Sequence, residues 1–111
     1  MSDHTNQVVL NIQFKLKPGT KEVFKEALYT VIEVMSNEPT FVNAVVSEDV
    51  DYPNIINLYE LWNHTKESWL AEEAPKPYRK VYDDKVEDLL EEKNLSWLKP
   101  VREWGSNLTN T

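Results

Sequence analysis

The chain has 111 residues, which is enough for one domain with a single hydrophobic core but not for two. Its net charge of −7 argues against binding to nucleic acid or to an anionic membrane, because both favour a basic surface. Cysteine is absent, so disulfide bonds, thiolate metal sites and a thiol nucleophile are excluded.

The first half of the chain predicts a strand, a helix and a second strand. Residues 1–6 are polar and are expected to be loose, whereas residues 7–16 alternate between apolar and polar side chains in the manner of a strand. A Pro-Gly-Thr sequence then breaks the strand, and apolar residues recur at helical spacing up to Met35. The predicted stripe of that helix is Val23, Phe24, Ala27, Leu28, Val31, Ile32 and Met35. Residues 41–47 are β-branched and apolar, and they predict the second strand.

The second half repeats this order of elements. A polar loop leads to a third strand at 55–62, and a loop of this length is typical of an antiparallel hairpin. A short helix is predicted at 66–73, and a longer one at 78–93. The apolar residues that the longer helix is expected to bury are Val81, Tyr82, Val86, Leu89 and Leu90. The last strand is predicted at 95–104, followed by a polar tail at 105–111.

The order βαββαβ predicts an α+β, ferredoxin-like domain over residues 7–104, with an antiparallel sheet and both helices on one face. The other face would then be bare. It would display a mixed surface made of Val9, Asn11, Gln13, Ile55, Asn57, Tyr59 and Leu61. A surface of this kind is larger than a monomer usually leaves exposed, so we expect two copies to pair through it as a homodimer.

The third strand carries an acidic residue at a position that should face the core. Counting by twos, Glu60 shares a strand face with Ile56, Leu58 and Trp62. A carboxylate in such a place must find a partner or keep its proton. We therefore take Glu60 as the first candidate for chemistry in this chain.

Three segments carry a resemblance to a known family. They are the Lys17-Pro18-Gly19 entry to the first helix, the Glu38-Pro39 approach to the second strand, and above all Leu58-Tyr59-Glu60-Leu61-Trp62. Together with the order of elements, these segments resemble the antibiotic biosynthesis monooxygenase (ABM) family over residues 7–104. The resemblance implies a dimeric α+β barrel with a pocket between sheet and helices. It also implies oxygenation of phenolic or quinol-like substrates without a metal or flavin, although relatives degrade haem or isomerise small phosphorylated sugars.

The sequence departs from the family in one segment. Many members place histidines in the helical segment after the third strand, whereas residues 71–79 contain none here. This difference argues against haem binding. It also leaves His64, just after the strand, as the only histidine near the candidate site.

Each candidate residue has a functional and a structural interpretation. Glu60 could be a general base with a raised pKa, or it could form a structural ion pair with Arg79 or a lysine. Trp62 could stack on a flat substrate or simply pack in the core. His64 could shuttle protons or cap the short helix. Trp69 could form a wall or lid of the pocket.

The start of the longer helix supplies further candidates for binding. Tyr78, Arg79 and Tyr82 could hold an anionic oxygen of the substrate, although an exposed arginine is more often solvated or paired. Asn43 lies in the middle of a strand, where asparagine is disfavoured, and it could orient a ligand oxygen or satisfy polar groups at a dimer interface. No spacing of histidines and carboxylates suggests a metal site.

The sequence thus predicts a homodimeric, cytoplasmic monooxygenase without a cofactor, acting on a small aromatic, quinol-like substrate. Two alternatives stay open. One is a non-catalytic dimeric module that binds a small molecule, and the other is an isomerase of a small carbonyl compound. The enzyme readings need Glu60 or His64 to titrate near neutrality, whereas the binding module predicts Glu60 in an ion pair. No contact with nucleic acid or a membrane is expected.

Overall fold

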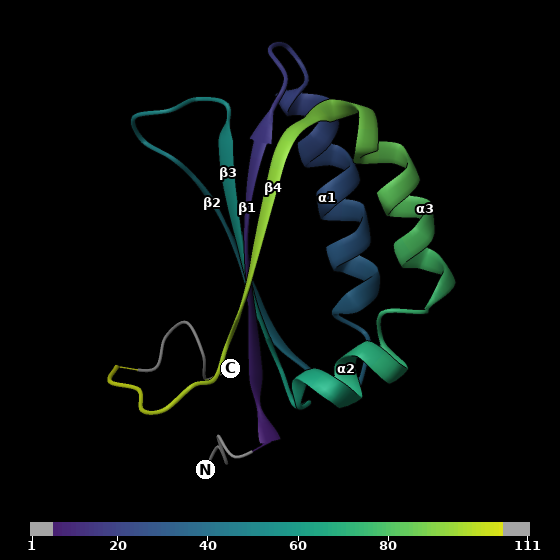
Figure 1. Ribbon diagram of the computed structural model, residues 1–111, viewed down its shortest axis with the longest axis vertical. Helices are drawn as coiled ribbons and strands as arrows, with labels where there is room; N and C mark the ends of the chain where they lie inside the picture. Colours follow the sequence, from purple (N-terminus) through teal and green to yellow (C-terminus); the bar gives the residue numbers. More distant parts are fainter. Residues whose placement is uncertain (1–5, 106–111) are drawn as a thin grey trace.

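The computed structural model describes residues 6–105 as one four-stranded sheet with helices packed on one of its faces (Figure 1). In chain order the elements are β1 (Val8–Leu16), α1 (Lys21–Met35), β2 (Phe41–Glu48), β3 (Ile55–Trp62), α2 (Lys66–Glu72), α3 (Pro77–Val86), the short 3-10 helix η2 (Glu87–Leu89) and β4 (Leu90–Leu98). The polar ends predicted at 1–6 and 105–111 lie outside the described residues, apart from Asn6 and Gly105. None of the helices within 6–105 is long and apolar enough to cross a bilayer.

The sheet has the strand order β2-β3-β1-β4, and every neighbouring pair is antiparallel. Figure 1 shows α1 and α3 side by side along one face of the twisted sheet, with α2 at one end. This arrangement confirms the predicted ferredoxin-like fold. The central strands β1 and β3 are paired so that Leu10 lies opposite Glu60, and this register places the acidic residue in the middle of the covered face.

The core forms where the alternating face of β1 meets the apolar stripe of α1. Phe14 and Phe24 pack against each other with ring centroids 4.9 Å apart. Four of the seven residues of the predicted stripe, Phe24, Leu28, Val31 and Met35, are buried. Val23 lies at the margin of that stripe and is mostly exposed. The periodicity therefore predicted the core correctly at its centre but extended it one residue too far around the helix.

The boundary between the last helix and the last strand differs from the prediction. The helix predicted at 78–93 ends at Val86, and the strand predicted at 95–104 is residues 90–98. Leu90 to Leu98 pair with the free edge of β1, and these interstrand hydrogen bonds override the helical preference of Glu91, Glu92 and Lys93. Val81, which was also expected in the core, is 57% exposed, because α3 packs against the core through Tyr78, Tyr82 and Val86 instead.

The face of the sheet away from the helices is less bare than predicted. Val9 and Leu61 were expected on its surface, yet each is only 3% exposed. The chain after β4 turns to this side of the sheet (Figure 1), and Glu103 lies near enough to Tyr59 to contribute, after partial burial of the phenol, to a raised tyrosine pKa. Asn11 and Gln13 remain exposed there, as expected.

Candidate active site

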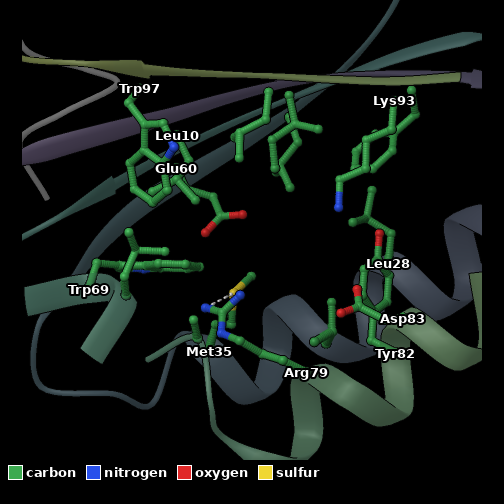
Figure 2. Close-up of a pocket in the computed structure, with 17 residues that line it drawn as sticks. Leu10, Leu28, Met35, Glu60, Trp69, Arg79, Tyr82, Asp83, Lys93 and Trp97 are labelled. Atoms are coloured by element: carbon green, nitrogen blue, oxygen red, sulfur yellow. Dashed lines mark hydrogen bonds between the residues drawn. The ribbon is translucent and has the colours of Figure 1, made fainter. Parts of the chain in front are cut away.

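A cavity of about 250 Å³ lies between the covered face of the sheet and the helices (Figure 2). Most of its wall is apolar, and β1, β3, β4, α1, α2 and α3 all contribute residues to it. The polar side chains and the tryptophans in the wall are Glu60 of β3, Trp69 of α2, Arg79, Tyr82 and Asp83 of α3, and Lys93 and Trp97 of β4. The apolar floor comes from β1 and α1, and includes Leu10, Ile12, Phe14, Leu28 and Met35.

Glu60 projects its carboxyl group from the sheet into this cavity (Figure 2). It is 2% exposed, and its Oε1 accepts a hydrogen bond of 2.8 Å from the Trp62 indole Nε1–H. Within residues 6–105 no ion pair involves this carboxylate. Burial raises the pKa of Glu60 above its ordinary value of 4.5, although the Trp62 hydrogen bond and the Arg79 charge act in the opposite direction. Glu60 is thus a buried acid that can hold or accept a proton.

Arg79 faces Glu60 from the helix side of the cavity (Figure 2). Its guanidinium carbon lies 4.5 Å from the centre of the Trp69 ring, within cation–π range, and its Nη2 contacts Met35 Sδ at 3.1 Å. Its Nε–H is buried and has no hydrogen-bond partner among the described residues. Glu60 and Arg79 therefore stand on opposite sides of a gap without being joined by an ion pair.

The charge of Arg79 is balanced by a second buried acid, Glu73, at the end of α2. Glu73 Oε2 lies 3.5 Å from Arg79 Nη2 and accepts a 2.8 Å hydrogen bond from the Tyr78 hydroxyl. Glu73 also pairs with Lys76 at 2.7 Å, and Lys76 is bonded in turn to Glu38. Burial alone would raise the pKa of Glu73, but the hydrogen bonds from Lys76 and Tyr78 outweigh it and lower the pKa. Glu73 thus remains an anion that offsets Arg79, whereas the pKa of Glu60 is shifted in the opposite direction, upward.

Three polar groups in the cavity wall lack hydrogen-bond partners among residues 6–105. They are the Nε1–H of Trp69, the Nε–H of Arg79 and the hydroxyl of Tyr82, all buried. Leaving such a group unsatisfied costs about 1–3 kcal/mol, so a polar ligand or water is expected to occupy the cavity. All three can donate a hydrogen bond, and they favour a ligand with oxygen acceptors.

Four of the predicted site residues meet at this cavity: Glu60, Trp69, Arg79 and Tyr82. Trp62 and Tyr78 do not line the cavity, but each donates a hydrogen bond to a buried acid beside it. Trp62 is fully buried and holds the Glu60 carboxyl by its indole N–H. Tyr78 bonds to Glu73, and burial followed by this hydrogen bond raises the pKa of its hydroxyl to about 12.

The structure does not bring His64 and Asn43 to the cavity. His64 is 6% exposed, its Nδ1 is 2.8 Å from Ser68 Oγ, and its ring packs at 6.1 Å from Trp62. It supports the start of α2, where the Thr65 side chain caps the helix. Asn43 lies opposite Leu61 in the register, and therefore on the other face of the sheet.

Lys93, Asp83 and Trp97 line the cavity but were not among the predicted site residues. The prediction placed Lys93 at the end of a helix and gave it no role in the site. In the structure Lys93, Leu95 and Trp97 are spaced by two along β4 and face the helices together. That spacing is visible in the sequence, and it could have revealed Lys93 and Trp97 as residues of the site.

The site can carry out acid–base chemistry on a ligand held between Glu60 and Arg79. A hydroxyl in the gap can donate to the carboxylate and accept from the guanidinium, and an anion formed there would face a positive charge. In residues 6–105, no group of three or more His, Asp or Glu side chains is placed to hold a metal ion.

The chain resembles known proteins in its sequence profile and in its fold. The profile of the antibiotic biosynthesis monooxygenase family matches residues 7–81. No curated protein sequence matches the chain significantly. Many solved structures share the fold. A protein from Nitrosomonas europaea assigned to the antibiotic biosynthesis monooxygenases has a TM-score of 0.79 at 22% identity, with 90% of this chain and 95% of that chain covered.

Two further structures have similar scores at lower identity. A Caulobacter crescentus protein assigned to the same group has a TM-score of 0.76 at 14% identity, covering 87% of this chain and 92% of its own. The N63A mutant of SnoaB, a cofactor-independent oxygenase from Streptomyces nogalater, has a TM-score of 0.76 at 13% identity, with coverage of 88% and 96%. Likeness at these identities establishes the fold, whereas the profile match over most of the chain establishes the family. This chain is a member of the antibiotic biosynthesis monooxygenase family.

Proposed function

We propose that this protein is a monooxygenase that needs no cofactor and oxidises a small hydroxylated aromatic compound. The observation that carries the proposal is the placement of Glu60, a buried acid outside any ion pair of the described residues, opposite the Arg79 guanidinium across a ligand-sized cavity. The resemblance of the fold to a cofactor-independent oxygenase supports the same assignment.

The proposed reaction begins with removal of a proton from a substrate hydroxyl by Glu60. The resulting anion lies next to Arg79, whose positive charge stabilises it. An electron-rich anion of this kind can pass one electron to O₂, and the two radicals then join to form a carbon–oxygen bond and a peroxide. The peroxide takes up the proton held by Glu60, the newly oxygenated carbon loses its C–H proton, and the O–O bond breaks with release of water. One oxygen atom thus enters the product as a carbonyl, and the substrate supplies all the electrons.

The size of the cavity limits the substrate. A dry cavity of about 150 Å³ is enough to bind benzene. The present cavity of about 250 Å³ suits one ring with substituents or two fused rings. Trp69 and Trp97, which pack edge to face with centroids 5.4 Å apart, form an aromatic wall for a flat molecule.

The alternatives make different demands on Glu60. A non-catalytic binding module would have Glu60 locked in an ion pair, and the geometry gives no support to that arrangement. An isomerase could use the same base on a small carbonyl compound, but it would not consume oxygen. Oxygen consumption therefore separates the two enzyme readings. The predicted cytoplasmic location stays a prediction.

The proposal is tested by oxygen uptake with a panel of one- and two-ring hydroquinones. We expect the protein to accelerate uptake well above the rate of spontaneous oxidation, and one atom of label from oxygen-18 gas to appear in the product. Superoxide dismutase and catalase added to every reaction remove the background of radical chain oxidation. Uptake no faster than with heat-denatured protein across the whole panel would reject the proposal, and turnover of a small carbonyl compound under argon would favour the isomerase.

We also propose that the protein is a homodimer paired through the sheet face opposite the helices. The support is the surface around exposed Asn11 and Gln13, which the chain after β4 leaves open, together with Leu98 at its border, 47% exposed. Light scattering at micromolar concentration should then give twice the 13.0 kDa of one chain. A Gln13→Arg substitution, which would place two like charges close together across the two-fold axis, should shift the mass toward one chain, whereas Lys80→Arg on the helix side should not. A monomer in the wild type would contradict the dimer.

A further inference from the structure

The proposed reaction leaves unexplained two charged residues that line the cavity, Lys93 and Asp83. Lys93 lies on β4 opposite Phe14, so its side chain is on the helix-covered face of the sheet, where apolar residues are the rule. Asp83 comes from α3 on the other side of the same cavity. Both residues are exposed, and they therefore mark the end of the cavity that opens to solvent.

These two residues face each other without pairing. Figure 2 shows the Lys93 ammonium pointing from the sheet toward the helix that carries Asp83, on the side of the cavity away from Trp69. Within residues 6–105 neither side chain takes part in an ion pair or hydrogen bond. Both charged groups are exposed and can be solvated when the cavity is empty. A ligand group that enters this part of the cavity would therefore lie between a carboxylate acceptor and an ammonium donor.

The outer pair has the same chemistry as the inner one. Glu60 and Arg79 present an acceptor and a cationic donor at the buried end, and Asp83 and Lys93 present the same combination at the open end. A hydroxyl group satisfies both members of such a pair, because it donates to the carboxylate and accepts from the cation. A carboxylate would satisfy Lys93 but would be repelled by Asp83.

We infer that Lys93 and Asp83 form a second subsite, which binds the distal hydroxyl of a ring compound hydroxylated at both ends. The inference rests on the cavity of the proposed function and extends it, since it names the two residues that select a ring with hydroxyl groups at opposite ends over a ring with one hydroxyl group. The inner hydroxyl reacts between Glu60 and Arg79. The outer hydroxyl sets the orientation of the ring and is the group that a competing monohydroxylated compound lacks.

The test measures binding without oxygen, by isothermal titration calorimetry under argon. The probes are 2-naphthol, 2,6-dihydroxynaphthalene and 6-hydroxy-2-naphthoate, which share one ring system and differ at the distal position. The wild type should bind the diol about five- to tenfold more tightly than 2-naphthol, the gain expected for hydrogen bonds at a partly solvated site. Lys93→Met and Asp83→Asn should each reduce this ratio to about twofold or less, with 2-naphthol affinity nearly unchanged.

Matched controls come from the same helix. Lys80 and Asp84 pair with each other at 3.3 Å on the exposed side of α3 and do not line the cavity. Lys80→Met and Asp84→Asn should leave all three affinities as in the wild type. Circular dichroism melting of each variant shows that the fold is retained, and Lys93→Gln provides a second, polar variant.

Several results would overturn the subsite. Equal binding of the diol and 2-naphthol to the wild type would do so. Tighter binding of 6-hydroxy-2-naphthoate than of the diol would also do so, because Lys93 would then be a site for an anion. If Lys93→Met left every affinity unchanged but promoted aggregation, Lys93 would be a charge that protects the edge of β4. Because no oxygen is used, a retained diol preference with no oxygen uptake would reject the monooxygenase and keep the subsite. Oxygen uptake without a preference for the diol would keep the monooxygenase and reject the subsite.

Discussion

Replacing Glu60 with glutamine is expected to lower the rate of oxygen uptake by about 100-fold or more, the usual contribution of a general base. Glutamine keeps the size of the side chain and an oxygen that can accept the Trp62 N–H. It cannot take a proton from the substrate hydroxyl. The loss should appear mainly in kcat, because the shape of the cavity and the Arg79 donor are preserved.

The same substitution should make the protein more stable at neutral pH. Burial raises the pKa of Glu60, so the folded carboxyl keeps its proton to a higher pH than the unfolded one. The stability that this group contributes is therefore full below its ordinary pKa of 4.5 and is lost as the pH rises through the raised folded-state value. Glutamine does not ionise, and at pH 7 we expect it to add about 1 kcal/mol to the free energy of unfolding.

Urea unfolding at pH 4.5 and pH 7, followed by circular dichroism, measures this effect. The gain from Glu60→Gln should be larger at pH 7 than at pH 4.5. Glu72→Gln, an exposed acid at the end of α2, should change neither stability nor oxygen uptake. If Glu60→Gln instead weakened the fold at pH 7, Glu60 would be a stabilising ion-pair partner, and its role as base would be untenable.

Replacing Trp62 with alanine should lower the free energy of unfolding by about 3–5 kcal/mol, the range for a large aromatic residue lost from a core. Trp62 is fully buried at the end of β3 and packs edge to face against Phe41 at 5.2 Å and Trp69 at 6.3 Å. Its removal would leave a large cavity beside the active site and would free the Glu60 carboxyl from its only hydrogen bond within residues 6–105.

A milder variant separates packing from electrostatics. Trp62→Phe keeps an aromatic ring but removes the N–H that favours the ionised form of Glu60, so the pH profile of oxygen uptake should move to higher pH. Urea titrations of both variants are compared with Trp104→Ala. Trp104 is 79% exposed, and its loss should change stability by less than about 0.5 kcal/mol. Equal effects of the Trp62 and Trp104 substitutions would show that Trp62 does not organise the site.

The fold could be predicted because local patterns and the sheet agree over most of the chain. Alternation in residues 7–16 and 55–62 assigned the two central strands, and it placed Glu60 correctly on the covered face. The prediction was wrong where local preference and pairing disagree. Residues 90–94 favour a helix by composition, but the free edge of β1 offers them a row of hydrogen bonds that only the assembled sheet can supply.

The boundary between the last helix and the last strand also decided which site residues could be predicted from the sequence. Glu60, Trp69, Arg79 and Tyr82 were predicted because their elements were assigned correctly, whereas Lys93 was missed because it was assigned to a helix. His64 was predicted as a site residue from its position near the end of the strand, yet its ring hydrogen-bonds with Ser68 and packs near Trp62. Which way a side chain at the end of an element turns depends on neighbours far away in the chain.

The sequence by itself determined the order of elements, the covered face of the sheet and the burial of a single acid on it. These follow from periodicities of two and of about 3.6 residues, which are local properties of the chain. Only the tertiary structure decided that Glu73 neutralises Arg79 and leaves Glu60 outside any ion pair of the described residues, and that Lys93 and Asp83 lie on opposite sides of the open end of the cavity. Charge pairing depends on distances of a few ångströms between separate elements, and sequence periodicity carries no information about such distances.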